Sequence, residues 1–405
     1  MPRKKAQKRI YLDYAAATPV DPRVFAAMKR YFSGAFGNAS SIHREGVEAK
    51  RALEDARETV ADALGAHTDE IIFTSGGTES NNLAIFGAVR AKEKAGTPLS
   101  RMHFITSTIE HPSVLDCMTS LLRRGAMVTY IGVSEEGIID PKEVREALCE
   151  QTVLVSIGYG NGEIGVVQPI REIAKEIRAA SVKKFQKPLF HTDASQAFAY
   201  LSCDVSHLGV DLMTLDAQKI YGPKGMSALF HRRLPAQAGG VSTSRLFEGG
   251  GQEGGLRPGT ENVPLAVGFA KAVELLLNTR EKEAKRLEKL AAYTRKKICA
   301  HIPEALVNGS IEKRLPNNVS ISIPGHDGEF LALALDARGI AVGTGSACML
   351  AAGDTSYVIR ALGFDAKRAL GTLRFSFGRT TKKRDIDMLV RALSEVISIQ
   401  KRVSH

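Results

Sequence analysis

The sequence predicts an α/β fold, with a mostly parallel seven-stranded sheet in a large domain and a smaller α+β domain after it. Three observations support this prediction. From about residue 20 to 270, short apolar segments alternate with helix-like segments, as they do where helices connect parallel strands. The chain has 405 residues, more than the ~250 to 300 at which a single core usually stops growing. A stretch rich in Lys and Glu, residues 264–302, then separates this pattern from the remainder.

Seven short apolar segments are the candidate strands of the large domain. In chain order they are Glu70–Thr74, Met102–Thr106, Met127–Ile131, Thr152–Ile157, Pro188–Thr192, Leu212–Leu215 and Met226–Phe230. Candidate helices include Glu45–Leu64 and Ile170–Ala179. Ligands of open parallel sheets bind beyond the carboxyl ends of the strands, so the polar residues that follow these segments are the first candidates for a site.

The stretch Pro264–Ile302 predicts one long amphipathic helix that leaves the first domain and enters the second. We expect a large domain over residues 18–265 and a small domain made of 1–17 and 266–405. Within the small domain the candidate strands and helices are Asn318–Ile323, Gly328–Arg338, Thr372–Ser376 and Arg384–Ser404.

Composition and charge exclude several classes of protein. Hydrophobic residues make up 44% of the chain and charged residues 24%, and no apolar run approaches the roughly 20 residues that cross a bilayer. Lys and Arg exceed Asp and Glu by 11 (55 against 44), but the excess is spread along the chain without a nucleic-acid motif, so direct nucleic-acid binding is not expected. The basic amino terminus lacks the apolar segment of a secretory signal.

The five cysteines are odd in number and widely separated, with no CxxC pair and no Cys/His metal spacing. This usage predicts free thiols in a reducing compartment, here the cytoplasm, and no metal site. Cys348 differs from the others, because a run of small residues that includes Gly343 and Gly345 precedes it.

Three motifs carry candidate chemistry. The run FTSGGTES, residues 73–80, follows a strand and opens a helix, so its backbone N–H groups can hold a phosphate; a Gly-Gly turn before a helix is equally often only a tight connection. Asp193 ends an apolar strand, where it either pairs with a cationic ring nitrogen or caps the next helix. Lys219, before a Gly-Pro-Lys-Gly turn, can form a Schiff base with an aldehyde cofactor, although lysines in such turns are usually surface residues.

The order and wording of these and other motifs are similar to those of the class I cysteine desulfurases, the NifS/IscS type, over nearly the whole chain. The motifs are YLDYAAATPVDPRV, FGNASSIH, FTSGGTESNNLAI, EHPSVLD, NGEIGVVQPI, HTDASQAF, QKIYGPKG, GGGQEGGLRPGTENV, GTGSACM, SYVIRALG and LRFSFGR. The resemblance implies the pyridoxal-phosphate-dependent transferase fold of type I. It also implies conversion of L-cysteine to L-alanine, with the sulfur passed to Cys348 as a persulfide and then to an acceptor protein.

The resemblance also implies a role for each site residue. Lys219 would carry pyridoxal 5'-phosphate and His111 would stack on its ring and assist proton transfer. Asp193 would pair with the ring nitrogen, and Gln196 would bond its phenolic oxygen. Gly77 and Thr78 would contact the cofactor phosphate, and Thr260 would contact the phosphate in the opposite subunit of a homodimer. Arg374 would bind the substrate carboxylate, and Asn161 would contact the substrate.

Several residues depart from the family's pattern around the cofactor. Asp216 and Gln218 stand where relatives have a serine and a histidine that bond the phosphate, and Gly162 replaces the second residue of a paired Asn that approaches cofactor or substrate. Gln218 can still donate, whereas an ionised Asp216 would repel the phosphate. Ala39 and Gly254 are further departures. We expect an active desulfurase that supplies sulfur for iron-sulfur clusters or for tRNA or cofactor thiolation; the alternatives are a selenocysteine lyase of the same fold and a turnover-impaired scaffold that binds acceptor proteins.

Overall fold

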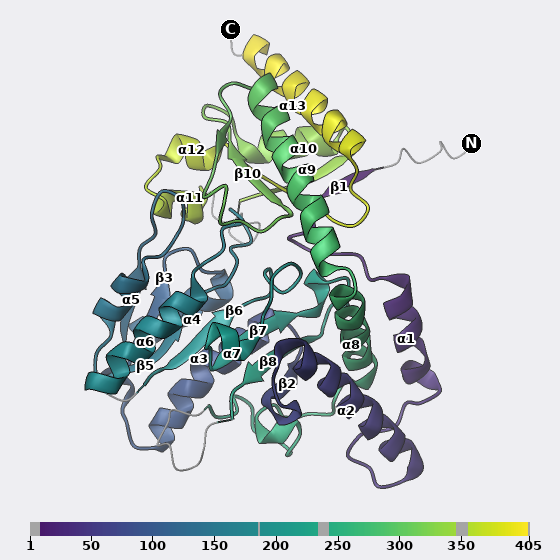
Figure 1. Cartoon of the computed structure of the whole chain (residues 1–405), viewed down its shortest axis with the longest axis vertical. Coiled ribbons are helices and arrows are strands. Elements are labelled where there is room, and N and C mark those ends of the chain that lie inside the picture. The colour runs from purple at the N-terminus through teal and green to yellow at the C-terminus, as the bar shows by residue number, and fades with distance from the viewer. Residues whose placement is uncertain (1–8, 185–186, 234–242, 346–354, 404–405) are drawn as a thin grey trace.

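The computed structural model describes residues 9–184, 187–233, 243–345 and 355–403. Two sheets organise these residues, a seven-stranded sheet in the lower part of Figure 1 and a five-stranded sheet above it. The fold predicted from the sequence, a mostly parallel seven-stranded sheet with a smaller mixed region, is confirmed. No helix within the described ranges is both long enough and apolar enough to cross a membrane.

The large sheet has the strand order β2-β8-β7-β6-β5-β3-β4. Its strands are β2 (Ile71–Thr74), β3 (His103–Ser107), β4 (Met127–Ile131), β5 (Thr152–Ser156), β6 (Leu189–Asp193), β7 (Leu212–Asp216) and β8 (Ser227–His231). Each lies within two residues of its predicted segment. Only β8 runs against its neighbours, so β2 points the same way as the parallel strands. The carboxyl ends of six strands therefore meet at one edge of the sheet.

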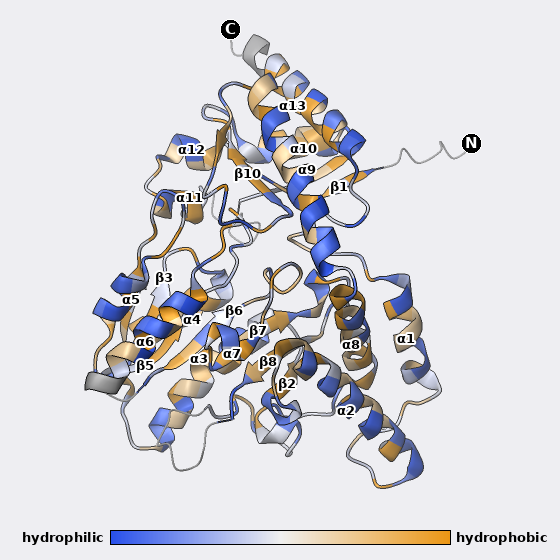
Figure 2. Ribbon diagram, in the orientation of Figure 1, coloured by the Kyte–Doolittle hydropathy of each residue, from blue (hydrophilic) through white to orange (hydrophobic). Residues whose placement is uncertain are grey.

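Helices cover both faces of this sheet, because neighbouring residues of a strand point to opposite faces. In β2, Ile71 and Phe73 join one core and Ile72 joins the other. The second core includes α3 (Gly77–Lys94) and α4 (Pro112–Arg123). The helices that contribute to the first core are α1 (Pro22–Ser33), α2 (Arg44–Leu64), α5 (Pro141–Ala147), α6 (Ile170–Lys184), α7 (Val205–Leu208) and α8 (Val263–Leu277). In Figure 2 the strands between these layers are mostly orange.

The small sheet has the order β1-β11-β12-β10-β9. Its strands are β1 (Ile10–Leu12), β9 (Leu306–Val307), β10 (Asn318–Ser322), β11 (Ile340–Thr344) and β12 (Thr372–Ser376). Strand β1 pairs in parallel with β11, so the first strand of the described chain joins a sheet of strands that follow residue 305. The remaining helices are α9 (Arg280–His301), α10 (Gly328–Asp336), α11 (Tyr357–Ala361), α12 (Ala366–Leu370) and α13 (Lys383–Val403). Of these, α9, α10 and α13 share a separate core with this sheet.

The prediction of a single helix over Pro264–Ile302 was wrong. The segment forms two helices, α8 and α9, which are separated at Asn278 and Thr279. Each helix belongs to a different core: α8 packs between α1 and α2 on the large sheet, and α9 packs on the small sheet. The break between the helices allows the apolar face of α8 to pack in the core of the large sheet and that of α9 to pack in the core of the small sheet. The Thr279 hydroxyl donates to the Leu275 carbonyl oxygen at 2.9 Å and satisfies one acceptor at the end of α8.

Candidate functional site

A pocket of about 410 Å³ opens at the carboxyl edge of the large sheet. The segments that follow β2, β3, β5, β6 and β7 line it, together with the start of the chain and residues of the small sheet. Eleven residues predicted as site residues lie in its wall: Gly77, Thr78, His111, Asn161, Gly162, Asp193, Gln196, Asp216, Gln218, Lys219 and Arg374. Segments that are distant in the sequence therefore meet as parallel-sheet topology requires.

Two further predicted residues are not among the described residues that line the pocket. Thr260 is described, lies on the surface, and does not line the pocket of this chain. Cys348 lies outside the described residues, in the gap between 345 and 355. Gly345, the last described residue before that gap, does line the pocket.

One end of the pocket, formed by Gly76, Gly77, Thr78, Ser195 and Asp216 and called here the anion end, suits a phosphate. Helix α3 begins at Gly77, and its N-cap Gly76 offers no side chain to the free N–H groups of the first turn. The Ser195 hydroxyl is buried without a partner and lies 3.3 Å from the place of a Cβ on Gly77. A tetrahedral anion would satisfy these donors.

Asp193 and His111 lie further along the pocket, at the end of β6 and before α4. The Asp193 carboxylate accepts hydrogen bonds from Asn81 Nδ2 at 2.8 Å and from the Ser195 N–H at 2.9 Å. His111 Nδ1 accepts the N–H of Ser113 at 3.1 Å, which leaves the proton of the neutral ring on Nε2. Burial lowers the pKa of His111 and favours this neutral form.

Lys219 reaches the pocket from the turn after β7. Its Nζ donates to the carbonyl oxygens of Ala15 and Ala16, each at 2.8 Å. Burial lowers the pKa of the Lys219 amine, against a smaller opposing effect of the Asp216 charge. A partly buried lysine with a lowered pKa is a better nucleophile and base at neutral pH than a surface lysine, which favours the cofactor-binding interpretation over a surface turn.

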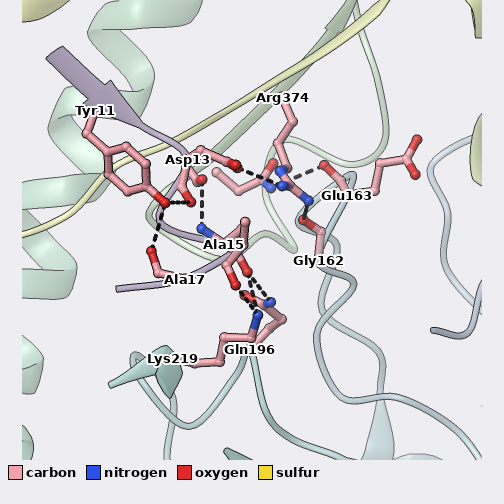
Figure 3. Close-up of polar contacts among 12 residues, drawn as sticks. Tyr11, Asp13, Ala15, Ala17, Gly162, Glu163, Gln196, Lys219 and Arg374 are labelled. Carbon is pink, nitrogen blue, oxygen red and sulfur yellow. Dashed lines mark hydrogen bonds and ion pairs between the residues drawn. The ribbon is translucent and has the colours of Figure 1, made fainter. Parts of the chain in front are cut away.

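Arg374 of β12 marks the opposite end, which we call the substrate end together with Asp13 and Gly162 (Figure 3). Its Nη2 donates to Asp13 Oδ1 at 2.7 Å and its Nη1 donates to the Gly162 carbonyl oxygen at 3.1 Å. The Nε atom is buried without a partner. A fixed guanidinium with an unused donor is suited to a carboxylate ligand.

The residues between the two ends already have partners within the protein. Gln196 Nε2 donates to the Ala15 carbonyl oxygen at 2.9 Å, beside the Lys219 amine (Figure 3). The Asn161 side chain accepts from two backbone N–H groups and donates to the Ile109 carbonyl oxygen at 2.8 Å, so it holds its own turn together. Gly162 lies against Gln196, whose Nε2 is 3.3 Å from the place of a Cβ.

Sequence reasoning missed four contributions to the site. Asp13 and the Ala15 carbonyl hold Arg374 and Lys219, and the Ser195 hydroxyl completes the anion end. Glu110, next to His111, lies fully buried and accepts from the Ser107 hydroxyl and from the Gly158 N–H at 2.8 Å. Asp13, Glu110 and Ser195 were visible as polar residues inside the family motifs, but nothing local distinguishes a residue that touches a ligand from one that supports it.

The pocket fits pyridoxal 5'-phosphate. It offers helix N–H groups and an unpaired hydroxyl for a phosphate, a buried amine for an aldehyde, and the Asp193 carboxylate for a protonated ring nitrogen. The residues that supply these three features line one cavity.

Comparisons with known proteins agree with this geometry. Residues 10–389 match the family described as aminotransferase class-V. The cysteine desulfurase IscS of Dictyoglomus turgidum is 40% identical over 398 residues, which cover 98% of this chain and 97% of the relative. The chain belongs to the cysteine desulfurases of the class-V aminotransferase family. Enzymes of this family depend in general on pyridoxal 5'-phosphate.

Solved structures of the family superpose on nearly the whole chain. A NifS-like protein matches with a TM-score of 0.87 and 33% identity, over 96% of this chain and 100% of that one. A protein called SspA, solved in complex with cysteine, matches with a TM-score of 0.77 and 35% identity, over 91% of this chain and 98% of that one.

Proposed function

We propose that this desulfurase converts L-cysteine to L-alanine and transfers the sulfur to Cys348 as a persulfide. The observation that carries the proposal is the shared pocket, which Lys219, Asp193 and Arg374 line and which Gly345 borders. Cys348 is three residues beyond Gly345, and three residues span at most about 10 Å. The solved complex of the related SspA with cysteine supports cysteine as the substrate.

Bound pyridoxal 5'-phosphate supplies an electron sink that labilises the α-proton and then the C–S bond of an amino acid. Arg374 binds the substrate carboxylate through its free Nε and fixes the amino acid beside Lys219. The Lys219 amine, with its lowered pKa, accepts the α-proton and returns it to the product carbon. His111, neutral and with its proton on Nε2, lines the same pocket and assists proton transfer.

The sulfur step balances without an external oxidant. The Cys348 thiolate attacks the substrate sulfur, the substrate C–S bond breaks, and its electron pair stays with the carbon that becomes the alanine methyl group. One thiol and one cysteine thus yield one persulfide and one alanine. A persulfide is a reversible modification of cysteine, so an acceptor thiol can remove the sulfur.

The test is direct detection of both products. Purified protein, loaded with pyridoxal 5'-phosphate and given L-cysteine without reductant, is expected to form alanine and a persulfide that mass spectrometry maps to Cys348. Cys348→Ala should abolish the persulfide, whereas Cys299→Ala, at an exposed thiol, should not change it. A persulfide on another cysteine, or normal turnover of Cys348→Ala, would refute the role of Cys348.

The same assay separates the two alternative functions. A selenocysteine lyase would release alanine from selenocysteine much faster than from cysteine, with little dependence on Cys348. A turnover-impaired scaffold, for which Asp216 and Gly162 are the motivation, would bind acceptor proteins and release no alanine. Alanine formation from cysteine that depends on Cys348 rejects both.

The protein acts as a homodimer in this proposal, with Thr260 completing the site of the partner chain. Large apolar side chains are exposed on and between two helices that flank α8: Phe25, Phe32, Phe36, Ile42 and Val47. An exposed apolar surface of this kind favours association. Light scattering should give twice the chain mass for the wild type and a shift toward the monomer for Ile42→Asp.

Three further assignments belong to this proposal. The acceptor is an iron-sulfur scaffold or a tRNA- or cofactor-thiolation protein, and the compartment is the cytoplasm. We propose that the boundary between the large and small domains, predicted after residue 265, lies at Asn278 and Thr279, because α8 shares the core of the large sheet. Capture of partners by the persulfidated protein, with Cys348→Ala as control, would identify the acceptor.

A further inference from the structure

The anion end contains a buried carboxyl group where a phosphate would bind. Asp216 ends β7, is only 6% exposed and lines the pocket. Its Oδ1 accepts the Gln218 N–H at 3.1 Å, and its Oδ2 accepts from Gln218 Nε2 at 2.8 Å. Both donors are neutral. The Gln218 amide is therefore engaged with Asp216 and does not offset a negative charge there.

The neighbours of Asp216 point to an anion at the same place. The Cβ position on Gly77, at the first turn of α3, lies 3.7 Å from Asp216 Oδ2 and 3.3 Å from the unpaired Ser195 hydroxyl. Asp216 Oδ2, Ser195 Oγ and the free N–H groups of α3 thus converge on one small volume. The Ser195 hydroxyl and the N–H groups of α3 can donate hydrogen bonds to a phosphate, whereas an ionised Asp216 would repel it.

The charged groups around Asp216 do not remove this conflict. Lys219 lies next in the turn, but its amine donates to the Ala15 and Ala16 carbonyls. Asp193, from β6, adds negative charge, and His111 faces the site as a neutral ring. Burial is the largest effect on Asp216 and raises its pKa, more than the Gln218 hydrogen bonds and the Lys219 charge lower it. Burial thus raises the affinity of Asp216 for a proton, and an anion bound beside it would raise that affinity further.

We propose that Asp216 binds the cofactor phosphate as a neutral carboxylic acid that donates a hydrogen bond, so that cofactor binding takes up one proton at this side chain. The inference rests on the proposed function, in which this pocket holds pyridoxal 5'-phosphate. Oδ2 carries the proton toward the phosphate, and Oδ1 keeps the Gln218 N–H. Loss of that proton places a carboxylate against a phosphate dianion, so the cofactor is released more easily as the pH rises.

The test compares the pH dependence of binding in the wild type and in Asp216→Asn, a neutral side chain of the same shape. The probe is pyridoxamine 5'-phosphate, which has no aldehyde and so cannot bond covalently to Lys219. Its dissociation constant is measured by calorimetry between about pH 6 and 9 at fixed ionic strength. Titration of the phosphate and of the probe's ring is common to both proteins and cancels in the ratio of the two constants. The same pair compared in a Lys219→Ala background removes the amine whose pKa the Asp216 charge raises.

We expect the wild-type dissociation constant to rise by up to tenfold per pH unit relative to that of Asp216→Asn, the limit for one linked proton. Calorimetry in two buffers of different ionisation enthalpy should show that the wild type takes up as much as one more proton per bound probe than Asp216→Asn does. Asp216→Ser should behave like Asp216→Asn, and thermal unfolding checks that both variants fold. Equal pH profiles with equal proton uptake would overturn the role of Asp216 alone. If no protein binds the probe at any pH, the proposed function fails as well.

Discussion

The two ends of the pocket treat negative charge in opposite ways. At the substrate end, the Asp13 carboxylate is matched by the Arg374 guanidinium at 2.7 Å. At the anion end, Asp216 is held only by the neutral Gln218. Glu110, which precedes His111 in the chain, resembles Asp216, because its carboxyl accepts hydrogen bonds only from neutral donors, the Ser107 hydroxyl and the Gly158 N–H.

This difference separates charges that persist from charges that depend on pH. A guanidinium stays protonated over the physiological range, so a carboxylate beside an arginine has a permanent cation as its partner. A carboxyl buried among neutral donors gains stability as the neutral acid. The substrate end thus offers the permanent cation of Arg374 to an anion. The carboxyl groups whose pKa burial raises, Glu110 and Asp216, lie elsewhere in the pocket wall.

Loss of the cation at the substrate end should have the largest effect. Arg374→Ala removes the donor that we propose for the substrate carboxylate and leaves the largely buried Asp13 without its cation. We expect kcat/KM for cysteine to fall roughly 100-fold or more, about 3 kcal/mol, as is common when one partner of a buried charge pair is truncated. Steady-state alanine release measures it.

Asp13→Asn is the matched control for Arg374, since its amide oxygen still accepts from Nη2 but carries no charge. The fall in kcat/KM of Asp13→Asn should stay below about tenfold and should arise mainly from a higher KM. An equal loss in both variants would mean that Asp13 contributes more than the orientation of Arg374.

The buried carboxyl group of Glu110 should make the stability of the cofactor-free protein depend on pH. Burial raises its pKa to about 7, despite hydrogen bonds from Ser107 and Gly158. The contribution of this group to stability is therefore complete below its ordinary pKa near 4.5 and is lost as the pH rises through about 7. The loss amounts to about 3 kcal/mol at most. Glu110→Gln should remove it, and urea unfolding at several pH values measures the difference.

Glu79→Gln provides a control of opposite sign. Burial raises the pKa of Glu79, but hydrogen bonds from Arg257 and Ser75 outweigh it and lower the pKa overall. The stability that Glu79 contributes is present above its ordinary pKa and lost as the pH falls. A Glu110→Gln protein that keeps the wild-type slope between about pH 5 and 8 would show that another group causes it.

The smallest effect is expected at Gly162. In Gly162→Ala the new methyl group meets Gln196 Nε2 at 3.3 Å, so the Gln196 side chain must shift and its hydrogen bond to the Ala15 carbonyl weakens. The expected fall in kcat/KM is roughly threefold, within the range of one neutral hydrogen bond. Gly132→Ala, where a Cβ meets nothing within 4 Å, should leave activity unchanged. No effect at Gly162 would mean that the Gln196 contact is dispensable.

The sequence alone determined the family, the strands of the large sheet and most of the pocket wall. Apolar strand segments and the turns after them are local patterns, and parallel topology brings the ends of such strands to one edge. Lys219, Asp193, His111 and Arg374 could therefore be selected from the motifs that contain them.

Only the tertiary structure decided which partner each charged group has. Asp13 pairs with Arg374 across 361 positions of sequence, and Lys219 donates to a carbonyl 204 positions away. The break at Asn278 also depends on two cores that α8 and α9 reach separately. The sequence showed that an ionised Asp216 would repel a phosphate. Only the structure shows that Gln218 donates to Asp216 and that the Ser195 hydroxyl has no partner, because burial and pairing are set by residues that packing brings together.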